Sequence, residues 1–320
     1  IGGWSYEPWR ETFYPADVPK TKELSYASRQ LTAIEINSTF YRSQPEPVFA
    51  KWAAETPDDF VFTVKAQRAT TSRKTPEDMK ESIGWFVTGG VTALGDKLGA
   101  INWQFPESRK FDVDYFGAFL SALPDEHEGV RVRHAIEVRN ETFRDEAFAD
   151  LLRQHGCALV FADDPDWPVA DVETADFAYA RLQQTQADIK TGYTAADLDK
   201  WSKTFKGWAK KRDVFAFFIS GAKEINPSAG DGSEQLESEE RALSLTVVGD
   251  AMQGFRLHII VPVQCVDQTA QLDMRGCQPF LTQDVERSIG RRLVGLRAFQ
   301  FRKQTEQRIS ACVTGGGSPI

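Results

Sequence analysis

The sequence predicts an α/β protein with the TIM (β/α)8 barrel fold, in which the first strand is clipped and the final helix is atypical or missing. Three observations support this prediction. Seven short apolar segments are almost continuous, which is typical of parallel strands buried on both faces. Most of them alternate with segments of helical periodicity, as in βα units. The glycine patterns of dinucleotide-binding and Walker loops are missing from the sequence, which disfavours a doubly wound sheet.

The expected elements follow one another in regular order. Strands are predicted at 33–41, 60–65, 100–105, 134–139, 158–163, 177–182 and 214–219. Helices are predicted at 22–31, 47–55, 75 onward, 112–123, 145–155 and 194–211. Pro76 and the acids after it are typical of a helix start, and Gly156 of a helix stop. Ile1–Gly3 matches only the tip of a strand, and counting it as the clipped first strand gives eight.

The last part of the chain differs in composition. We predict a barrel domain at 1–227 and an atypical tail at 228–320. All eight Trp and all seven Tyr precede this boundary, and the residues from 230 onward hold nine Arg but one Lys. Residues 226–233 predict a loop where the barrel needs its last helix. We expect the tail to be disordered or poorly packed; the alternative is a second small domain, whose best strand candidate is 255–263.

Charge and composition narrow the classes of protein to consider. A hydrophobic content of 41% is that of a globular domain, and a formal charge of -8 disfavours duplex nucleic acid as the main partner. No run of eighteen apolar residues predicts a membrane span. The four Cys lack the spacing of a metal site, which favours a reduced cytoplasm. The sequence starts without Met or a visible signal peptide, so an upstream piece is expected to be missing.

Polar side chains stand at the ends of the predicted strands, where the active sites of TIM barrels lie. A charge in a buried strand is costly unless it is paired or opens onto a cavity, which makes these residues candidates for function. We predict catalytic roles for Glu35, Glu137, Lys65 and Asp163. We predict ligand-binding roles for Trp4, Tyr6, Asn37, Tyr41, Gln104, Arg139 and Arg181. The four His are poorly placed, so we expect neither a metal nor a cofactor.

Glu35 and Glu137 lie three strands apart in the predicted ring, so their carboxyl groups are expected to approach one another across the mouth. Chemistry with two carboxylates uses separations of about 5 to 9.5 Å. Lys65 and Arg139 are expected to keep one of them ionised, while burial raises the pKa of the other. The alternative for each charged residue is an ion pair that closes the top of the barrel, and for each aromatic residue it is packing at the rim.

Two functions fit these residues. The first is an enzyme that uses the glutamate pair for acid/base chemistry on a small polar or anionic substrate, sugar-like or phosphorylated. In it Lys65, Arg139 and Arg181 hold an anionic group. The second is a non-catalytic protein that binds an anionic ligand or single-stranded nucleic acid through the same bases and the aromatic rim. We favour the enzyme, and a small ligand over nucleic acid; hydrolase and isomerase both stay open.

Several separate motifs occur in a definite order along the chain. They are Gly3-Trp4-Ser5-Tyr6, Phe13-Tyr14-Pro15, Glu35-Ile36-Asn37-Ser38-Thr39-Phe40-Tyr41, Lys51-Trp52, Val64-Lys65-Ala66, Lys97-Leu98-Gly99, Gln104-Phe105-Pro106 and Ala135-Ile136-Glu137-Val138-Arg139. Together they resemble the YecE-like family, domain of unknown function 72, over about 1–227. The resemblance implies a TIM barrel whose activity is not established. The chain departs from the family in having Arg181-Leu182-Gln183-Gln184 where many relatives have Arg-Leu-His-Gly.

Overall fold

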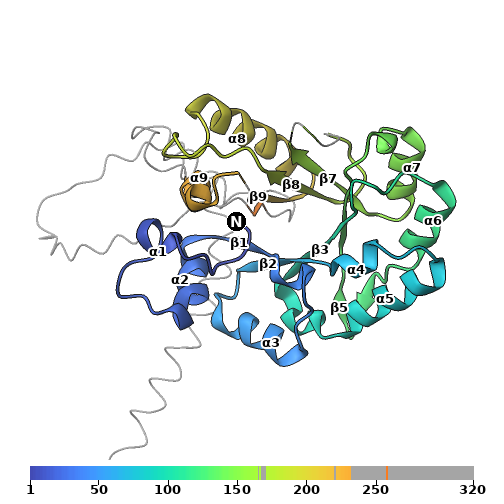
Figure 1. Ribbon diagram of the computed structural model, residues 1–320, viewed down its shortest axis with the longest axis horizontal. Helices are drawn as coiled ribbons and strands as arrows, with labels where there is room; N and C mark the ends of the chain where they lie inside the picture. The colour runs from blue at the N-terminus through green and yellow to red at the C-terminus, as the bar shows by residue number, and fades with distance from the viewer. Residues whose placement is uncertain (165, 167–170, 220, 232–256, 259–320) are drawn as a thin grey trace, which may run out of the picture. The chain divides into compact units, whose positions relative to one another are not determined.

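The computed structural model describes residues 1–164, 166, 171–219, 221–231 and 257–258, and it confirms the predicted barrel (Figure 1). In this part of the chain, parallel strands form one nearly closed sheet in the order β1-β2-β3-β6-β7-β8-β9, and a short β10 pairs with β9. Helices surround the strands in Figure 1. The barrel belongs to a compact unit at Ile1–Cys265, and a second unit, Val266–Ile320, lies outside the described residues.

The strands and helices follow one another in the predicted order. The strands are β1 (Ala33–Ile36), β2 (Val61–Lys65), β3 (Leu98–Gln104), β4 (Glu126–His127), β5 (Val130–Arg131), β6 (His134–Glu137), β7 (Ala158–Asp163), β8 (Phe177–Leu182), β9 (Asp213–Phe218) and β10 (Leu257–His258). The α-helices are α1 (Trp9–Thr12), α2 (Glu23–Gln30), α3 (Glu46–Glu55), α4 (Arg68–Thr71), α5 (Pro76–Thr88), α6 (Val113–Ser121), α7 (Glu146–Gln154), α8 (Ala195–Ala209) and α9 (Asn226–Asp231). The 3-10 helices are η1 (Lys20–Lys22), η2 (Ser38–Phe40), η3 (Val91–Lys97), η4 (Glu141–Phe143) and η5 (Lys223–Ile225).

Helices α5, α6, α7 and α8 begin where short polar side chains cap them. The Thr75 hydroxyl accepts a hydrogen bond from the Asp78 amide, and α5 follows with Pro76 in its first turn. Asp112 and Thr194 cap α6 and α8 in the same way. Each such cap satisfies an amide that the helix leaves unpaired and stabilises it by about 1 kcal/mol. Local sequence therefore sets the helix starts.

The interior of the barrel is filled by side chains two residues apart on each strand. The layer nearest the amino ends of the strands is apolar and includes Ala33, Val61, Ala100, Ala135, Ala158, Phe177 and Phe215. Side chains on the opposite faces of the strands pack in a larger cluster against the helices. Burial on both faces explains why the strand segments are almost continuously apolar. It also means that a charged side chain inside the barrel, nearer the carboxyl ends of the strands, must have an ion-pair or hydrogen-bond partner.

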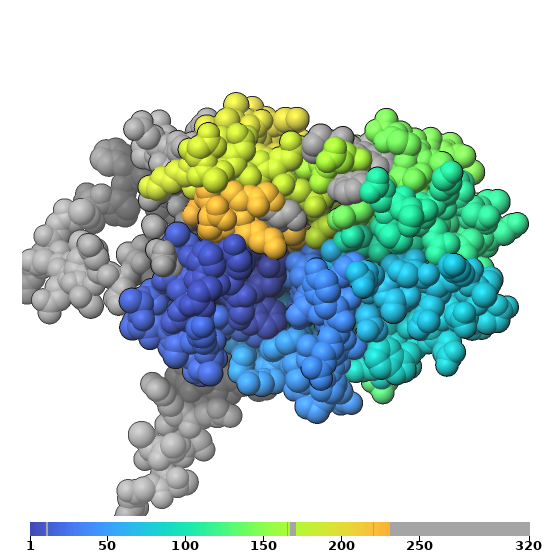
Figure 2. Space-filling model, viewed as in Figure 1, coloured from blue at the N-terminus to red at the C-terminus, as the bar shows by residue number. Residues whose placement is uncertain are grey.

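The start of the chain pairs with β1 and contacts the segment that follows β9. The Glu35 amide donates to the Ile1 carbonyl at 2.9 Å, and the Gly3 amide donates to the Glu35 carbonyl at 2.8 Å. These bonds place Ile1–Gly3 beside β1, as expected for a clipped strand. The indole of Trp9 donates to the Lys223 carbonyl at 2.7 Å, and Figure 2 shows the blue residues of the chain start against the orange residues around α9.

Two predicted boundaries differ from the structure. The strand expected at 33–41 ends at Ile36, because Asn37 takes helical backbone angles and η2 follows. The loop expected at 226–233 contains α9, in which Pro227 stands in the first turn, where its missing amide hydrogen costs nothing.

Helix α9 also crosses the domain boundary predicted at 227. Ala229 in this helix is buried in the apolar cluster between the strands and the helices. The remainder of the expected tail lies outside the described residues, apart from β10, which falls within the strand candidate at 255–263. The expectation that the tail is disordered or poorly packed therefore stays a prediction.

Candidate active site

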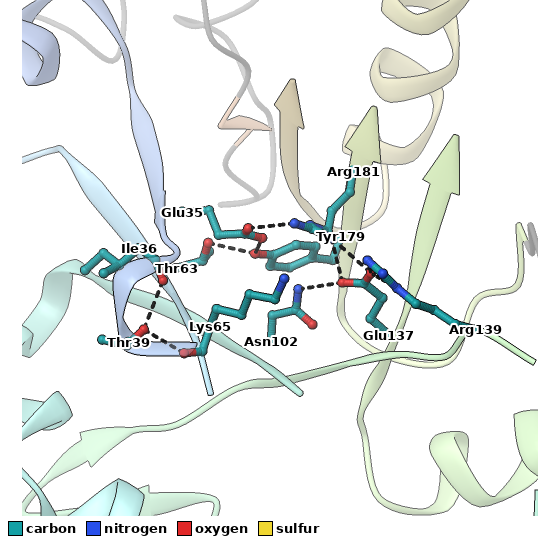
Figure 3. A network of polar contacts seen from close by, with 10 residues as sticks. All are labelled: Glu35, Ile36, Thr39, Thr63, Lys65, Asn102, Glu137, Arg139, Tyr179 and Arg181. Carbon is teal, nitrogen blue, oxygen red and sulfur yellow. Dashed lines mark hydrogen bonds and ion pairs between the residues drawn. The ribbon is translucent and has the colours of Figure 1, made fainter. Parts of the chain in front are cut away.

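Above the apolar layer, the inward side chains of the barrel become polar (Figure 3). Alternation along β1 places Glu35 two residues beyond Ala33, and alternation along β6 places Glu137 two residues beyond Ala135. The polar residues gathered in this way are Glu35, Thr63, Lys65, Asn102, Glu137, Arg139, Tyr179 and Arg181. We call them the buried network. Five of the predicted site residues therefore lie together.

Arg181 joins the two glutamates. Its Nη1 donates to both carboxylate oxygens of Glu137 at 2.8 and 2.9 Å, and its Nη2 donates to Oε1 of Glu35 at 3.1 Å. The exposed fractions of Glu35, Glu137 and Arg181 are 0%, 1% and 2%. Removal of one charge would leave the others buried without compensation, so the three act as a unit. The two carboxylates approach one another only through the guanidinium between them.

Glu137 accepts further hydrogen bonds from the surrounding side chains. Arg139 donates to its Oε1 from Nη2 at 2.7 Å and from Nε at 3.1 Å, and Asn102 donates to its Oε2 at 3.1 Å. Burial raises the pKa of this carboxyl, but the opposing effects of Arg181, Lys65 and Arg139 are larger together and lower it to about 2. Glu137 is thus a fixed anion at neutral pH and has no proton to donate.

Glu35 is held on its other oxygen by a tyrosine that the sequence interpretation missed. The hydroxyl of Tyr179 donates to Oε2 of Glu35 at 2.6 Å, and the Thr63 hydroxyl lies 2.8 Å from the same phenol oxygen. Burial and the neighbouring Glu35 raise the pKa of Tyr179 well above its usual value, so it stays a neutral donor. The signal was present in the sequence, because Tyr179 lies two residues before Arg181 on the same strand face.

Lys65 differs from the other charges of the network because its amine is not paired. Only 7% of the residue is exposed, and among the described residues no carboxylate lies within ion-pair distance of its Nζ. The amine faces the ring of Phe40 at 4.6 Å from the centroid. Burial and the nearby Arg181 lower the pKa of Lys65 to about 8, although Glu137 and Glu35 oppose this change. A substantial part of the amine is therefore neutral near pH 8.

Four buried polar atoms in the described part of the chain lack a hydrogen-bond partner. They are Oδ1 of Asn102, Oε1 of Gln104, Nε of Arg181 and Nε2 of Gln183. Asn102 and Gln104 share the inward face of β3, and Gln183 is two residues beyond Arg181. A buried polar atom without a partner is costly, so such a group at the mouth of a barrel is suited to a polar ligand.

Asp163 does not join the network. On β7 the residues Ala158, Val160 and Ala162 face inward, which turns Phe161 and Asp163 toward the helices. The carboxylate of Asp163 accepts from Gln184 at 2.7 Å and from Tyr193 at 3.1 Å. The prediction counted Asp163 among the residues of the mouth because it ends a strand, whereas the alternation of β7 assigns it to the other face.

Of the three aromatic residues predicted at the rim, two pack against other rings and one is exposed. Trp4 packs edge-on against Trp52, with ring centroids 5.0 Å apart, and Tyr6 packs on Trp9 at 5.6 Å. These contacts agree with the alternative interpretation of both residues as packing. Tyr41 is 78% exposed and is the predicted aromatic residue that remains open to a ligand.

Asn37 comes directly after β1, beside the start of the chain. A Cβ at Gly2 would lie 2.4 Å from its Nδ2, so the absence of a side chain at Gly2 gives Asn37 its room. The described residues contain no cluster of three or more His, Cys, Asp or Glu that could hold a metal. They also contain no helix with the length and apolarity needed to cross a membrane. The cytoplasmic location inferred from the cysteines stays a prediction.

The geometry changes the role that fits the glutamate pair. A general acid must hold a proton and reach the substrate, but Glu137 is ionised and both carboxylates are closed off from solvent by Arg181 and its neighbours. The two glutamates are placed to hold Arg181 and to act on the charge of Lys65. Direct proton transfer from this pair is therefore not favoured by the structure.

Comparison with known proteins gives one consistent family. A family model described as "Protein of unknown function DUF72" matches residues 1–244. The chain is similar to the UPF0759 protein YunF of Bacillus subtilis strain 168, with 26% identity over 261 residues that cover 71% of this chain and 90% of YunF. The match extends the family region beyond the boundary at 227 that the motifs indicated.

Two solved structures share the fold. One is a DUF72 family protein, TM1631, from Thermotoga maritima, with a TM-score of 0.56 and 22% identity over 70% of this chain and 92% of that one. The other is a DUF72 family protein, EF0366, from Enterococcus faecalis, with a TM-score of 0.53 and 18% identity over 71% of this chain and 93% of that one. At these identities the likeness shows the fold alone.

Proposed function

This chain belongs to the DUF72 family, and we propose that it is an enzyme that acts on a small polar or anionic substrate at the barrel mouth, with Lys65 as the residue that exchanges a proton with it. The observation that carries the proposal is the buried amine of Lys65, which has no ion-pair partner among the described residues although it ends a barrel strand. A lysine buried in this way destabilises a fold, so its presence here favours a functional role. Strand ends are where TIM barrels carry their chemistry.

The glutamate pair serves this chemistry through Lys65. Glu35 and Glu137 raise the pKa of the amine against burial and Arg181, and so keep it near 8. A base with a pKa close to the working pH combines a useful neutral fraction with a real affinity for protons. In this proposal Lys65 transfers the proton, and the glutamate pair sets its pKa.

The unpartnered polar atoms favour a hydroxyl-rich substrate. Nε of Arg181 and Nε2 of Gln183 are donors, whereas Oδ1 of Asn102 and Oε1 of Gln104 are acceptors. A hydroxyl group both donates and accepts, so a sugar-like molecule could satisfy all four atoms.

A screen by thermal shift tests the proposal. The probes are phosphorylated and unphosphorylated pentoses and hexoses, and each compound that raises the melting temperature is then followed by NMR for conversion. We expect Lys65→Met to retain binding and to lose turnover, whereas the exposed-helix variant Lys80→Met keeps both. In the unmodified protein the rate should rise with pH through about 8, as the amine becomes neutral.

Two results would decide against this function. Full turnover in Lys65→Met would show that the amine does not react. Binding of a probe without any conversion by the unmodified protein would instead support the alternative, a protein that binds an anionic or sugar-like ligand and does not transform it.

A further inference from the structure

An open cleft of about 1010 Å³ lies between the segments that follow β1, β2 and β3. It is separate from the buried network, although Phe40 lines the cleft and also faces the Lys65 amine. Its charged and aromatic lining residues are Phe40, Tyr41, Arg68, Lys74, Arg109 and Lys110. None of the described residues that line it is an Asp or Glu. The cleft is therefore positively charged in a chain of formal charge -8.

Three of its cations are available to a ligand. Within the described part of the chain, Arg68, Lys74 and Lys110 are exposed, and their side chains make no ion pair. Arg109 is fixed instead, because its Nη2 donates to the Arg73 carbonyl at 2.7 Å and its guanidinium lies 4.3 Å from the ring of Tyr115. Like charges that converge without a counter-charge repel one another, which an anionic ligand would relieve.

The cleft also offers an aromatic surface to solvent. Tyr41 is 78% exposed, and its ring packs edge-on against Phe40 with centroids 5.3 Å apart. The ring of Tyr41 therefore lies open to stacking beside the exposed cations. The same combination of cations and aromatic rings is how proteins hold the phosphates and bases of a single strand.

We propose that this cleft binds single-stranded nucleic acid, with the phosphates on Arg68, Lys74 and Lys110 and a base stacked on Tyr41. The aromatic ring distinguishes a single strand from a duplex, because paired bases are stacked on one another and cannot stack on a side chain. The volume of the cleft lies at the upper end of the range of small-molecule pockets, about 300 to 1,000 Å³, and cations from separate segments of the chain suit several phosphates better than one. The proposal does not depend on turnover at Lys65.

Fluorescence anisotropy with a labelled oligothymidylate of about 12 nucleotides tests the proposal between about 50 and 200 mM salt. Each phosphate contact on a single strand contributes about -0.7 to the slope of log K against log salt, so three cations predict a slope of about -2. The variant Arg68→Ala/Lys110→Ala should reduce the slope by about 1.4. The matched variant Lys203→Ala/Lys210→Ala removes the same charge at α8 and should leave the slope unchanged.

The stacking contact has its own variant. Tyr41→Ala should lower the affinity for the oligonucleotide by about 5- to 150-fold, which corresponds to the range found for one stacked base. Trp85→Ala removes another exposed aromatic ring, 58% exposed and outside the cleft, and should have no effect. Circular dichroism and melting curves confirm that each variant is folded before its binding is compared.

Three outcomes would overturn the proposal. The first is no saturable binding of the oligonucleotide at about 50 mM salt. The second is a salt slope that Arg68→Ala/Lys110→Ala leaves unchanged. The third is equal competition by thymidine monophosphate or by polyglutamate, which would show a site for a single nucleotide or for polyanions in general.

Discussion

The buried network and the neighbouring cleft differ in how their charged side chains are paired and exposed. In the network, one guanidinium is shared by two carboxylates within hydrogen-bond distance, and all three groups are sealed from water. In the cleft, cations such as Arg68 and Lys110 point into solvent without carboxylates among the lining residues. Lys65, whose amine faces Phe40 of the cleft, is buried and has no ion-pair partner among the described residues.

This difference in pairing and exposure distinguishes charged residues that stabilise the fold from charged residues that are free to bind a ligand. A buried ion pair is strongly coupled to stability, because the loss of one partner exposes the other to a medium that solvates it poorly. An exposed cation contributes little to stability, because water and salt screen it. The two regions should therefore respond to substitution in opposite patterns, the network through folding and the cleft through binding.

The largest effect is expected for Glu137→Gln. The substitution keeps the shape of the side chain but leaves Arg181 with Glu35 as its remaining carboxylate. The free energy of unfolding should fall by about 3 to 5 kcal/mol, as measured for broken buried pairs. Urea unfolding measures the change. The control Glu141→Gln removes an exposed pair with Arg144 and should cost about 0.5 kcal/mol or less; equal losses in the two variants would remove the distinction between the regions.

The same carboxylate predicts a loss of stability in acid. Its pKa is about 2 in the folded protein against 4.5 when unperturbed, so the stabilisation is complete above about pH 5 and is lost as the pH falls toward 2. A difference of about 2.5 units corresponds to about 3 kcal/mol. Melting temperature against pH should show this decline in the unmodified protein, and Glu137→Gln should reduce its steepness. A variant that declines as steeply as the parent would assign the acid sensitivity to other groups.

An opposite sign is expected for Lys65→Met. The pKa of Lys65 is lowered from 10.5 to about 8, so the unfolded chain binds more protons between these values and the charged amine costs stability below pH 8. Replacement by a neutral side chain of similar length should stabilise the fold at pH 7 by about 2 to 3 kcal/mol, a gain that fades as the pH rises above 8. Urea unfolding at pH 7 and pH 10 measures both values; a destabilised variant would show that the amine has a partner in solution.

The smallest effect on stability is expected in the cleft. Arg68→Ala/Lys110→Ala should change the free energy of unfolding by about 0.5 kcal/mol or less, because both side chains are exposed and unpaired in the described part of the chain. Thermal unfolding at low salt provides the measurement. A marked gain in stability would also be informative, since it would show that the repulsion among the cleft cations costs the free protein more than screening suggests.

The alternation of side chains carried most of what could be predicted about the barrel and its site. Glu35 and Glu137 were found because a carboxylate inside an apolar strand needs compensation, and the period of two would have added Tyr179 and turned Asp163 to the outer face. These are properties of one strand at a time, so the local sequence contains them. The helix starts at Thr75 and Asp112 are local in the same sense.

Which side chains of different strands contact one another could not be predicted from the sequence. The stagger of the barrel decides that Arg181 lies between both glutamates, which turned a predicted acid/base pair into a fixed ion cluster and left Lys65 unpaired. The cleft is a stronger case, because Arg68, at the start of α4, and Lys110, before α6, are ordinary exposed cations on separate segments. Local propensity acts over a few residues, whereas the distance between two segments depends on the packing and register of the strands beneath them. The sequence alone thus determined the fold and the face of each strand residue, and the tertiary structure decided which charges are paired.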